Sequence, residues 1–466
     1  MKKKHKIILF LSRGETIRNF VYSGIIDLIQ IDLEVIIYSV VKEDFIPKKT
    51  RKNINQYHIL EPYNEKKIVL LIRKIIHWAH FREQWTYTAQ NHWEMHDFRA
   101  KSLSAKLKRK IIKFFAWIAS YKTILYYLTL FENYITWIFR PKNIYEEEFL
   151  KIKPSFVFNC SHIHGKEAEF PIYIAKNLGF KTGTFIFSWD NLTTRSRIFP
   201  PYDYYFVWHN KMKKQLSRIY PRIIKKNILV TGTPQFDFHF NNKFFIDKNQ
   251  FFKNYNLDPQ RPFILYTTGI AGHFPEEHKT LVKIIDFINN IKSNPRPVLL
   301  IRPYIKDTSA AMNELRNKSN ENIKFIDMLW DKDSLTPLKE DLVLFCNLLR
   351  YCSFGINAAS TVSFDLMIFN KGVININFDP PNSSLPKHLK WERHIKFDHY
   401  KPIANSGAVL LSQSIDDLFD KILKLLDDPE MLLKAQTKVL DSFFDKKLDG
   451  NSAKRLANTL SSCTLK

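Results

Sequence analysis

The chain has 466 residues, of which 45% are hydrophobic, and its formal net charge is +25 at pH 7. This length exceeds one ordinary hydrophobic core and predicts two domains. The hydrophobic content excludes a disordered or fibrous chain. The positive charge indicates an anionic partner, such as a nucleic acid, an anionic membrane or a phosphorylated small molecule.

The N-terminal segment predicts a strand, a helix and a second strand. A basic start and the apolar run Ile7–Leu11 resemble a signal peptide, but the run is too short for an h-region and has no small-residue cleavage site. We therefore expect a buried strand at 6–12 and a cytoplasmic protein. A helix at 17–30 and a strand at 33–41 follow, and this βαβ order predicts a parallel sheet covered on both faces.

Residues 66–140 interrupt the α/β pattern with a segment rich in Lys, Arg, Trp, Tyr and Phe. One hypothesis is an interfacial helix with its cations on anionic headgroups and its aromatic rings at the boundary. The alternative is a helical insertion that packs on its own domain and leaves its lysines in water. Charges interrupt the roughly 20 apolar residues that a membrane span requires, so we expect no span. The basic cluster consists of Lys106, Lys108, Arg109, Lys110 and Lys113.

The α/β pattern then resumes and continues through a second series. A polar, aromatic segment at 231–261 without clear period separates the two series. We expect an α/β fold with two Rossmann-like domains that face a cleft, where ligands bind at the carboxyl ends of both sheets. The expected boundaries are an N-terminal acceptor-side domain at 1–235 with the insertion at about 66–140, a C-terminal nucleotide-binding domain at 258–430, and a helical tail at 431–466.

Polar side chains follow three strands of the predicted N-terminal sheet, in the loops SRGETIRN, NCSHIHGKE and SWDNLTTRS. In a parallel sheet these loops emerge at the same edge. We expect Glu15, His162, His164 and Asp190 to converge there, with one carboxylate or imidazole acting as the general base on a polar acceptor. The alternative for each residue is an ordinary loop or helix-capping role.

The predicted C-terminal sheet carries glycines, an arginine and hydroxyls at its strand ends. The glycines of TTGIAGHF allow backbone amides to approach a phosphate, and the arginine after VLLI can form a forked bond to an anion. The turn INAAST begins a helix with an acidic residue one turn later. An ordinary turn, a surface arginine and N-capping explain the same residues. The candidate ligand-binding residues are Gly269, Gly272, Arg302, Ser360, Thr361 and Asp365.

The order of these motifs resembles a known group of enzymes. SWDNLTT, VW, VTGTPQFD, LIRP and INAAST, followed by a C-terminal DGNSAKR, occur in this order. The order resembles that of the GT-B type glycosyltransferases of bacterial surface polysaccharide synthesis. It is more distantly similar to that of the CDP-glycerol glycerophosphotransferases of teichoic acid synthesis. The resemblance covers roughly residues 151–460 and, more loosely, the first βαβ unit.

The resemblance implies a nucleotide sugar on the C-terminal domain and an acceptor on the N-terminal domain, with no cofactor and no obligatory metal. Two departures are present: RPYI stands where the related pattern often has RPHP, and an aspartate stands where it usually has glutamate. The first departure argues against a phosphotransferase mechanism, and the second affects the ribose contact. The implied diphosphate contacts are Gly272, Ser360, Thr361 and Arg302, and the implied ribose contact is Asp365.

The sequence thus predicts a glycosyltransferase that moves a sugar from a nucleotide-diphosphate donor to a surface-polysaccharide or lipid-linked glycan acceptor. The insertion would hold it peripherally on the anionic inner face of the plasma membrane. Alternatives are a glycerophosphotransferase or a sugar-nucleotide epimerase on the same fold, and a non-enzymatic nucleic-acid-binding protein. No recognition helix, zinc finger or RNP-type signature accompanies the basic charge, so we do not expect a nucleic acid as the partner.

Overall fold

The chain folds into two compact units. Unit 1 comprises Met1–Gln235, Asp333–Thr336 and Asn451–Lys466, and unit 2 comprises Phe236–Lys332 and Pro337–Gly450. The structure is a computed structural model, and the residues that it describes are 5–29, 33–140, 144–163 and 165–465.

Unit 1 is built on a seven-stranded sheet with the order β3-β2-β1-β4-β5-β6-β7, and all neighbouring strands are parallel. The direction of winding reverses between β1 and β4, which places the switch point of a doubly wound sheet there. The strands are β1 (His5–Leu11), β2 (Leu33–Ser39), β3 (Gln56–Ile59), β4 (Phe156–Asn159), β5 (Thr182–Phe185), β6 (Tyr204–Val207) and β7 (Ile228–Val230).

Continuous apolar runs explain why the inner strands of unit 1 are parallel and covered. All residues of Ile7–Leu11 in β1 and of Phe156–Asn159 in β4 are buried. Strands buried on both faces need helices on both sides. Outside the insertion, the helices of unit 1 are η1 (Ile17–Tyr22), α1 (Ile25–Ile29), η3 (Glu43–Phe45), α2 (Lys48–Arg51), α7 (Ile144–Ile152), α8 (Lys166–Asn177), α9 (Asn191–Thr194), α10 (Asn210–Ile219), η4 (Lys225–Asn227) and α20 (Ser452–Leu465).

Two expected helical segments differ from the structure. The helix expected at 17–30 is divided into the π-helical η1 and α1, because Gly24 between them adopts a left-handed φ of 82°; Gln30 lies outside the described residues. The tail expected at 431–466 is divided between the units: α20 packs on α1 and β1 of unit 1, whereas α19 (Leu433–Phe444) belongs to unit 2.

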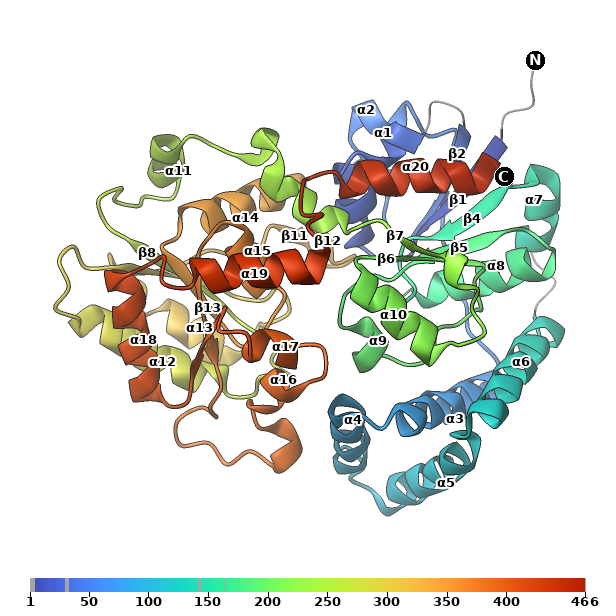
Figure 1. Ribbon diagram of the computed structural model, residues 1–466, viewed down its shortest axis with the longest axis horizontal. Helices are drawn as coiled ribbons and strands as arrows, with labels where there is room; N and C mark the ends of the chain where they lie inside the picture. Colours follow the sequence, from blue (N-terminus) through green and yellow to red (C-terminus); the bar gives the residue numbers. More distant parts are fainter. Residues whose placement is uncertain (1–4, 30–32, 141–143, 164, 466) are drawn as a thin grey trace. The chain divides into compact units, whose positions relative to one another are not determined.

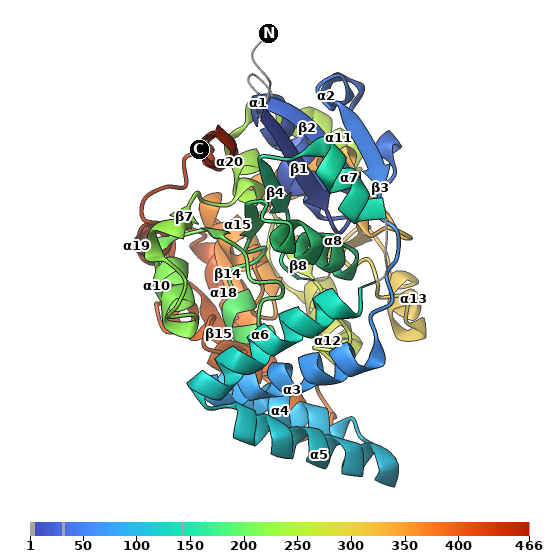
Figure 2. The ribbon, with the colours of Figure 1, turned by 90° about the vertical axis from the view of Figure 1, so that its right-hand side faces the viewer.

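The expected insertion is a group of four helices in unit 1: α3 (Lys67–Gln84), α4 (Tyr87–Phe98), α5 (Leu103–Ala119) and α6 (Lys122–Ile138). They share a small core that includes Ile76, Ala116 and Leu125. Figures 1 and 2 show α5 at the end of this group that lies farthest from the strands of unit 1. No helix in the described part of the chain is both long and apolar enough to span a membrane.

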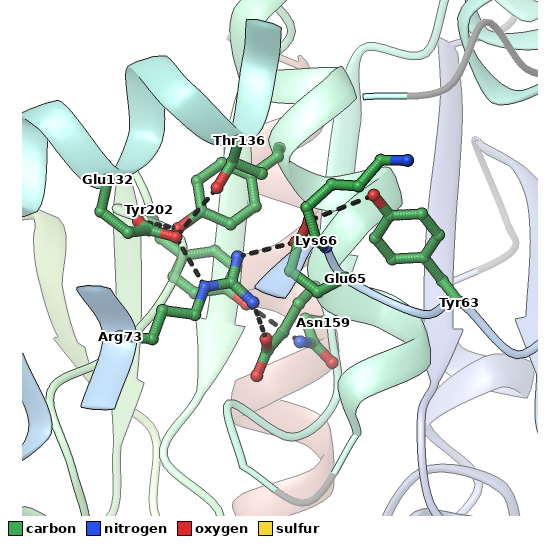
Figure 3. A network of polar contacts seen from close by, with 10 residues as sticks. Tyr63, Glu65, Lys66, Arg73, Glu132, Thr136, Asn159 and Tyr202 are labelled. Carbon is green, nitrogen blue, oxygen red and sulfur yellow. Dashed lines mark hydrogen bonds and ion pairs between the residues drawn. The ribbon is translucent and has the colours of Figure 1, made fainter. Parts of the chain in front are cut away.

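A buried ion-pair network joins the insertion to the rest of unit 1 (Figure 3). Arg73 of α3 lies 2.6 Å from the Glu132 carboxylate of α6, 3.0 Å from that of Glu169 in α8 and 3.4 Å from that of Glu65. Glu132 is fully buried and also accepts hydrogen bonds from Thr136 and Tyr173. Burial alone would lower the pKa of Arg73, but Tyr173 and the carboxylates raise it. This network fixes α3 and α6 against α8.

Unit 2 is built on a six-stranded parallel sheet with the order β10-β9-β8-β13-β14-β15. Its switch point lies between β8 and β13. The strands are β8 (Phe263–Thr267), β9 (Val298–Arg302), β10 (Ile323–Phe325), β13 (Phe354–Asn357), β14 (Gly372–Ile376) and β15 (Leu410–Ser412), and β11 (Trp330–Asp331) and β12 (Thr336–Pro337) form a separate short pair.

The core of unit 2 joins apolar faces of its helices to this sheet. Leu281, Ile284 and Ile288 of α12 are buried in one cluster with Ile301 and Ile356 of the strands. The remaining segments are the connection η5 (Pro234–Phe240) and η6 (Asn242–Phe244), α11 (Lys248–Asn254), α12 (Glu277–Asn290), α13 (Ala310–Arg316), α14 (Lys339–Tyr351), α15 (Val362–Ile368), η7 (Lys387–Leu389), α16 (Arg393–Lys396), α17 (Lys401–Ala404), α18 (Ile415–Asp427) and α19.

Candidate functional site

The switch point of unit 1 brings together the loops that follow β1, β4 and β5. The Ser12 hydroxyl donates to Asn159 Oδ1 over 3.0 Å, and Asn159 Nδ2 donates to the Tyr202 hydroxyl over 2.9 Å. A Cβ on Gly165 would lie 2.4 Å from Ser12 Cβ, so only glycine allows this approach of the β1 and β4 loops. The Arg13 guanidinium lies 4.3 Å from the centre of the Phe187 ring in the β5 loop.

Glu15 is held in an ion pair at this edge. Both of its carboxylate oxygens accept hydrogen bonds from Arg13, one of them over 2.8 Å. Burial alone would raise the pKa of Glu15, but the hydrogen bond and charge of Arg13 outweigh it and lower the pKa. The structure therefore corrects the interpretation of Glu15 as a free base: its proton affinity is reduced and its oxygens are engaged.

His162 is a buried support of the β5 strand end. Its Nδ1 accepts from the backbone amide of Phe187 over 3.3 Å and lies 3.4 Å from the carbonyl of Phe185. These contacts explain the residue as part of the loop framework. The second predicted histidine, His164, lies outside the described residues.

Asp190 cross-links the SWDNLTT segment. Its carboxylate accepts hydrogen bonds from the hydroxyls of Ser188 and Thr194 and from Asn191 Nδ2, and the Thr194 bond is 2.8 Å long. Trp189 is buried beside it. The four-residue helix α9 is thus closed by side chains, which accounts for the density of polar groups in this loop.

Unit 2 contains a buried carboxyl that the sequence did not single out. Glu277, the first residue of α12, accepts from the Tyr266 hydroxyl over 2.8 Å and from the backbone amide of Gly269 over 2.9 Å. Burial raises its pKa to about 8 and outweighs the lowering by these two hydrogen bonds. Glu277 therefore fixes the loop after β8 and carries a proton for much of the time at neutral pH.

The two glycines of the β8 loop have different surroundings. A Cβ on Gly269 would lie 2.1 Å from the Phe274 ring, so this position requires glycine for packing. A Cβ on Gly272 would meet no heavy atom within 4 Å. The loop is held by Arg393, which donates to the His273 carbonyl, and by Trp391, whose indole donates to Pro275 over 3.2 Å. Gly272 is thus an open position on a fixed loop.

Arg302 is engaged within unit 2, which corrects its expected role. The residue is 2% exposed, and its guanidinium lies 2.7 Å from the carboxylate of Asp341 in α14. It also donates to the carbonyl of Asp327 over 3.3 Å. A buried carboxylate already neutralises this cation, so Arg302 is neither a surface arginine nor a suitable diphosphate contact.

Asp365 is engaged in a similar way, and the implied ribose contact requires correction. The carboxylate of Asp365 lies 2.6 Å from Nε2 of His239, and Nδ1 of the same ring lies 3.7 Å from the Cys346 sulfur. All three residues are buried in unit 2. His239 and Asp365 are 126 positions apart, so their pairing could not be predicted from the sequence.

The turn after β13 is built around Asn357. Its Oδ1 accepts from the backbone amide of Ser360 over 3.0 Å, from the hydroxyl of Ser363 over 3.2 Å and from Asn375 over 3.0 Å. Ala359 adopts a left-handed φ of 54° and so turns the chain towards Ser360. Thr361 is the residue before α15. The structure therefore places both predicted hydroxyl residues at the switch point of unit 2.

Two buried polar atoms at this switch point have no hydrogen-bond partner among the described residues: Asn357 Nδ2 and Thr267 Oγ1. Thr267 ends β8 and Asn357 ends β13, the two strands on either side of the switch point. An unpaired buried donor is costly unless a ligand or water satisfies it. These atoms, the open Gly272 and the Ser360 turn form the candidate ligand site of unit 2. Within the described residues there is no group of three or more His, Cys, Asp or Glu that could hold a metal ion.

Comparison with solved structures shows extensive similarities, of which three are described. The S. aureus MnaA-UDP co-structure aligns with 98% of this chain and 96% of its own at a TM-score of 0.56 and 12% identity. UDP-GlcNAc 2-epimerase from Neisseria meningitidis bound to UDP-GlcNAc aligns with 98% and 100% of the two chains at 0.55 and 12%. A glycosyltransferase from Rickettsia africae aligns with 100% and 99% at 0.52 and 12%.

At such identities these similarities describe the fold alone. No protein-family model matches the chain, and no curated protein matches its sequence. The distant similarity to CDP-glycerol glycerophosphotransferases stays a prediction. The parallel sheets of both units and the similar structures confirm the predicted fold class: the chain has the GT-B type of fold, with two Rossmann-like units.

Proposed function

We propose that this protein is a metal-independent glycosyltransferase. Unit 2 binds a nucleotide-diphosphate sugar, and unit 1 binds the acceptor, a surface-polysaccharide or lipid-linked glycan. The observation that carries the proposal is the pair of unpaired donors, Asn357 Nδ2 and Thr267 Oγ1, at the switch point where ligands of open α/β sheets bind. Two of the similar structures are complexes with UDP and with UDP-GlcNAc, which supports a nucleotide sugar as the donor.

The proposed diphosphate position is beside the loop of Gly272 and the turn of Ser360. Glycosyl transfer requires an oriented acceptor hydroxyl and positive or dipolar groups that stabilise the leaving diphosphate. Backbone amides and hydroxyls of these two segments supply the second requirement. For the first requirement Asp190 stays the predicted base; an acceptor hydroxyl would have to replace one of the hydrogen bonds that its carboxylate accepts from Ser188 and Thr194.

The first test is a thermal-shift screen of the whole protein with UDP, GDP, CDP, dTDP and CMP. We expect one diphosphate to raise the melting temperature and Gly272→Val to abolish this shift, because the new side chain would occupy the space open at Gly272 without meeting protein atoms near its Cβ. The matched control is Ala310→Val at an exposed position of unit 2. No shift with any nucleotide at millimolar concentration would refute the proposal.

A sugar-nucleotide epimerase is the second candidate, favoured by the structural similarity to the UDP-GlcNAc 2-epimerase from Neisseria meningitidis. The two functions differ in their need for an acceptor. Incubation of the protein with its nucleotide sugar alone distinguishes them: conversion to an epimer without added acceptor supports the epimerase, whereas transfer that requires acceptor supports the glycosyltransferase.

We also propose that α5 and α6 hold the protein on an anionic membrane surface. Each helix exposes an apolar stripe at helical spacing, opposite the residues that it buries. Aromatic rings within these stripes suit the boundary between headgroups and acyl chains. The stripe of α5 consists of Leu103, Leu107, Ile111, Phe114 and Ile118, and that of α6 consists of Ile124, Tyr127, Phe131, Tyr134 and Ile138.

Cations accompany the stripe of α5. Lys106, Lys108 and Lys110 are exposed, and the sequence of α5 contains no aspartate or glutamate. Lys113 differs, because it is buried and paired with Asp97 at 2.5 Å. Basic residues near an anionic leaflet contribute about 1 kcal/mol each to binding. These three exposed lysines therefore favour an anionic membrane over a neutral one.

Liposome flotation tests this part of the proposal. We expect the protein to float with vesicles that contain phosphatidylglycerol and not with phosphatidylcholine vesicles, and we expect Lys106→Glu with Lys110→Glu to abolish flotation. Lys434→Glu with Lys438→Glu is the matched control, because it reverses two exposed lysines at the same spacing on α19. Equal flotation of the two double variants would contradict the assignment to α5.

A further inference from the structure

A separate cavity of unit 1 lies between the insertion and the edge of the sheet, with a volume of about 540 Å³. It is bounded by α6, by the segment that enters β6 and by the segment that follows α10. Most of its walls are apolar or aromatic, including Leu125, Tyr126, Ile198, Tyr205 and Tyr220. A cavity of this size and lining suits an elongated apolar ligand.

Two arginines give this cavity a positive charge. Arg197 lies over the Tyr220 ring at 4.9 Å and Arg222 over the Tyr126 ring at 3.6 Å, and all four residues line the cavity. Arg197 Nε is buried without a hydrogen-bond partner among the described residues. Guanidinium groups held on aromatic rings in this way are positioned to bind a phosphate.

The acidic residues at the cavity do not neutralise these arginines. Glu83 pairs with Lys122 at 3.8 Å, and Asp203 pairs with Lys176. Each carboxylate thus has a lysine partner of its own. The two arginines keep their charge available for an anion that enters from outside.

The rim of the cavity is apolar and exposed. Leu130 of α6 is 42% exposed and Ile224 is 58% exposed, and both line the cavity. Leu130 lies on the same helix as the exposed apolar stripe of α6. The chain of an apolar ligand would therefore meet an apolar entrance at Leu130 and Ile224.

We propose that this cavity binds a phosphorylated lipid, with the hydrocarbon chain along the aromatic walls and the phosphate on Arg197 and Arg222. Apolar walls alone would accept any hydrocarbon, and arginines alone would accept any phosphate; the combination requires both parts in one molecule. We identify this lipid as the carrier of the glycan acceptor, and this identification rests on the proposed function. The binding of a phosphorylated lipid to the cavity does not depend on that function.

The test is a calorimetric titration of the full chain with farnesyl phosphate below the concentration at which this lipid aggregates. We expect saturable binding that is at least about tenfold tighter than that of farnesol, and no binding of inorganic phosphate at millimolar concentration. Farnesol measures the contribution of the hydrocarbon chain, and inorganic phosphate measures the contribution of the phosphate. Absence of saturable binding of farnesyl phosphate, or equally tight binding of inorganic phosphate, would overturn the proposal.

Two variants locate the binding. Arg197→Gln with Arg222→Gln is expected to weaken farnesyl phosphate binding at least about tenfold and to leave farnesol binding unchanged. Ile224→Asp, at an exposed position on the rim, is expected to weaken the binding of both ligands. Matched controls are Arg218→Gln on the exposed part of α10 and Ile59→Asp on β3, both outside the cavity. Unchanged farnesyl phosphate binding in both cavity variants would refute the site.

The result is distinguishable from a failure of the proposed function. The expected rise in melting temperature with UDP depends on unit 2, whereas all residues of this cavity belong to unit 1. A protein that binds UDP but not farnesyl phosphate would refute only the lipid site. A protein that binds farnesyl phosphate at the arginines but no nucleotide would refute only the transferase.

Discussion

Asn159 and Asn357 occupy the same topological position in the two units. Each ends the strand next to the first strand of its sheet, across the switch point, and each is buried. Both amide oxygens accept a hydrogen bond from a serine of the adjoining loop. Asn159 Nδ2 is satisfied by Tyr202, whereas Asn357 Nδ2 has no partner among the described residues. This difference favours unit 2 as the nucleotide side.

Asn357→Asp tests the difference directly. The aspartate keeps an acceptor for Ser360 but replaces the unpaired donor with an anionic oxygen that repels a diphosphate. We expect the affinity for the nucleoside diphosphate to fall by more than about tenfold in calorimetry. Asn159→Asp in unit 1 is the control and should leave nucleotide affinity unchanged. Equal losses of nucleotide affinity in the two variants would contradict the assignment of the nucleotide to unit 2.

Glu277 predicts a pH dependence of stability. Its pKa rises from 4.5 to about 8 on folding, so between these values the native state binds a proton that the unfolded state has lost. The contribution of Glu277 to the free energy of unfolding is therefore present below pH 4.5 and is lost as pH rises to about 8. The loss is up to about 1.4 kcal/mol per pH unit. Urea unfolding at about pH 5.5 and about pH 7.5 should show this loss in the wild type.

Glu277→Gln should remove most of that pH dependence, because the amide does not titrate. Its oxygen can still accept from the Gly269 amide, and its nitrogen can donate to the oxygen of the Tyr266 hydroxyl, as the protonated carboxyl can. Glu276→Gln is the adjacent control, since Glu276 pairs with Lys279 at the surface. A pH slope that persists in Glu277→Gln would mean that another group causes it.

Arg302 and Asp341 allow a comparison of single and double variants. Arg302→Met leaves a buried carboxylate without its cation and should reduce the free energy of unfolding by about 3–5 kcal/mol. Arg302→Met with Asp341→Asn removes both charges, keeps an amide oxygen as an acceptor for the Leu329 amide, and should be less destabilised than Arg302→Met alone. Arg316→Met, at a more exposed pair with Asp327, should cost less than about 1 kcal/mol.

The same variants test the sequence-based role of Arg302. If it is structural, any UDP-induced rise in melting temperature should persist in Arg302→Met. Loss of the shift while Arg302→Met stays folded would restore Arg302 as a diphosphate contact.

We expect the stability of the protein to depend on the ion-pair network of Arg73, which joins the insertion to the rest of unit 1. Arg73→Met leaves Glu132 buried and uncompensated and should cost about 3–5 kcal/mol in chemical unfolding. Lys74→Met on the exposed side of the same helix should change stability by less than about 0.5 kcal/mol. Similar values for the two variants would show that the Arg73 network contributes little.

Asp190→Asn tests the retained base. The amide oxygen can still accept from Thr194, whereas the amide nitrogen would face the Asn191 donor, so the melting temperature of the variant is measured alongside its activity. Proton removal from the acceptor is lost. We expect kcat to fall by about 10²–10⁴-fold with a small change in KM for the donor. Thr193→Ala is the neighbouring control; a kcat of Asp190→Asn close to that of the wild type would exclude Asp190 as the base.

Most of the sheet architecture could be predicted from sequence because its inner strands are continuous apolar runs, such as IILFL in β1 and ILYT in β8. β3, with the sequence QYHI, was missed because it is short and only partly buried. The helix expected at 17–30 was too long, because apolar spacing does not reveal the left-handed turn at Gly24.

The candidate site was predicted less well than the fold. Strand ends located the loops, and the structure places Ser360 and Gly272 at the switch point of unit 2. The roles of Arg302 and Asp365 were not predictable, because their partners Asp341 and His239 are distant in sequence. Glu277 gave no signal either: its raised pKa comes from burial against β8, which only the folded chain creates.

The packing of α20 on α1 and β1 has a consequence for biosynthesis. Leu456 and Leu460 of this helix are fully buried in unit 1, yet they follow the whole of unit 2 in the chain. During translation unit 2 can complete its fold while unit 1 still exposes the apolar surface that α20 covers. The first unit to be synthesised is therefore the last to be finished, and a nascent chain that stops near residue 450 leaves the ribosome with a surface for chaperones.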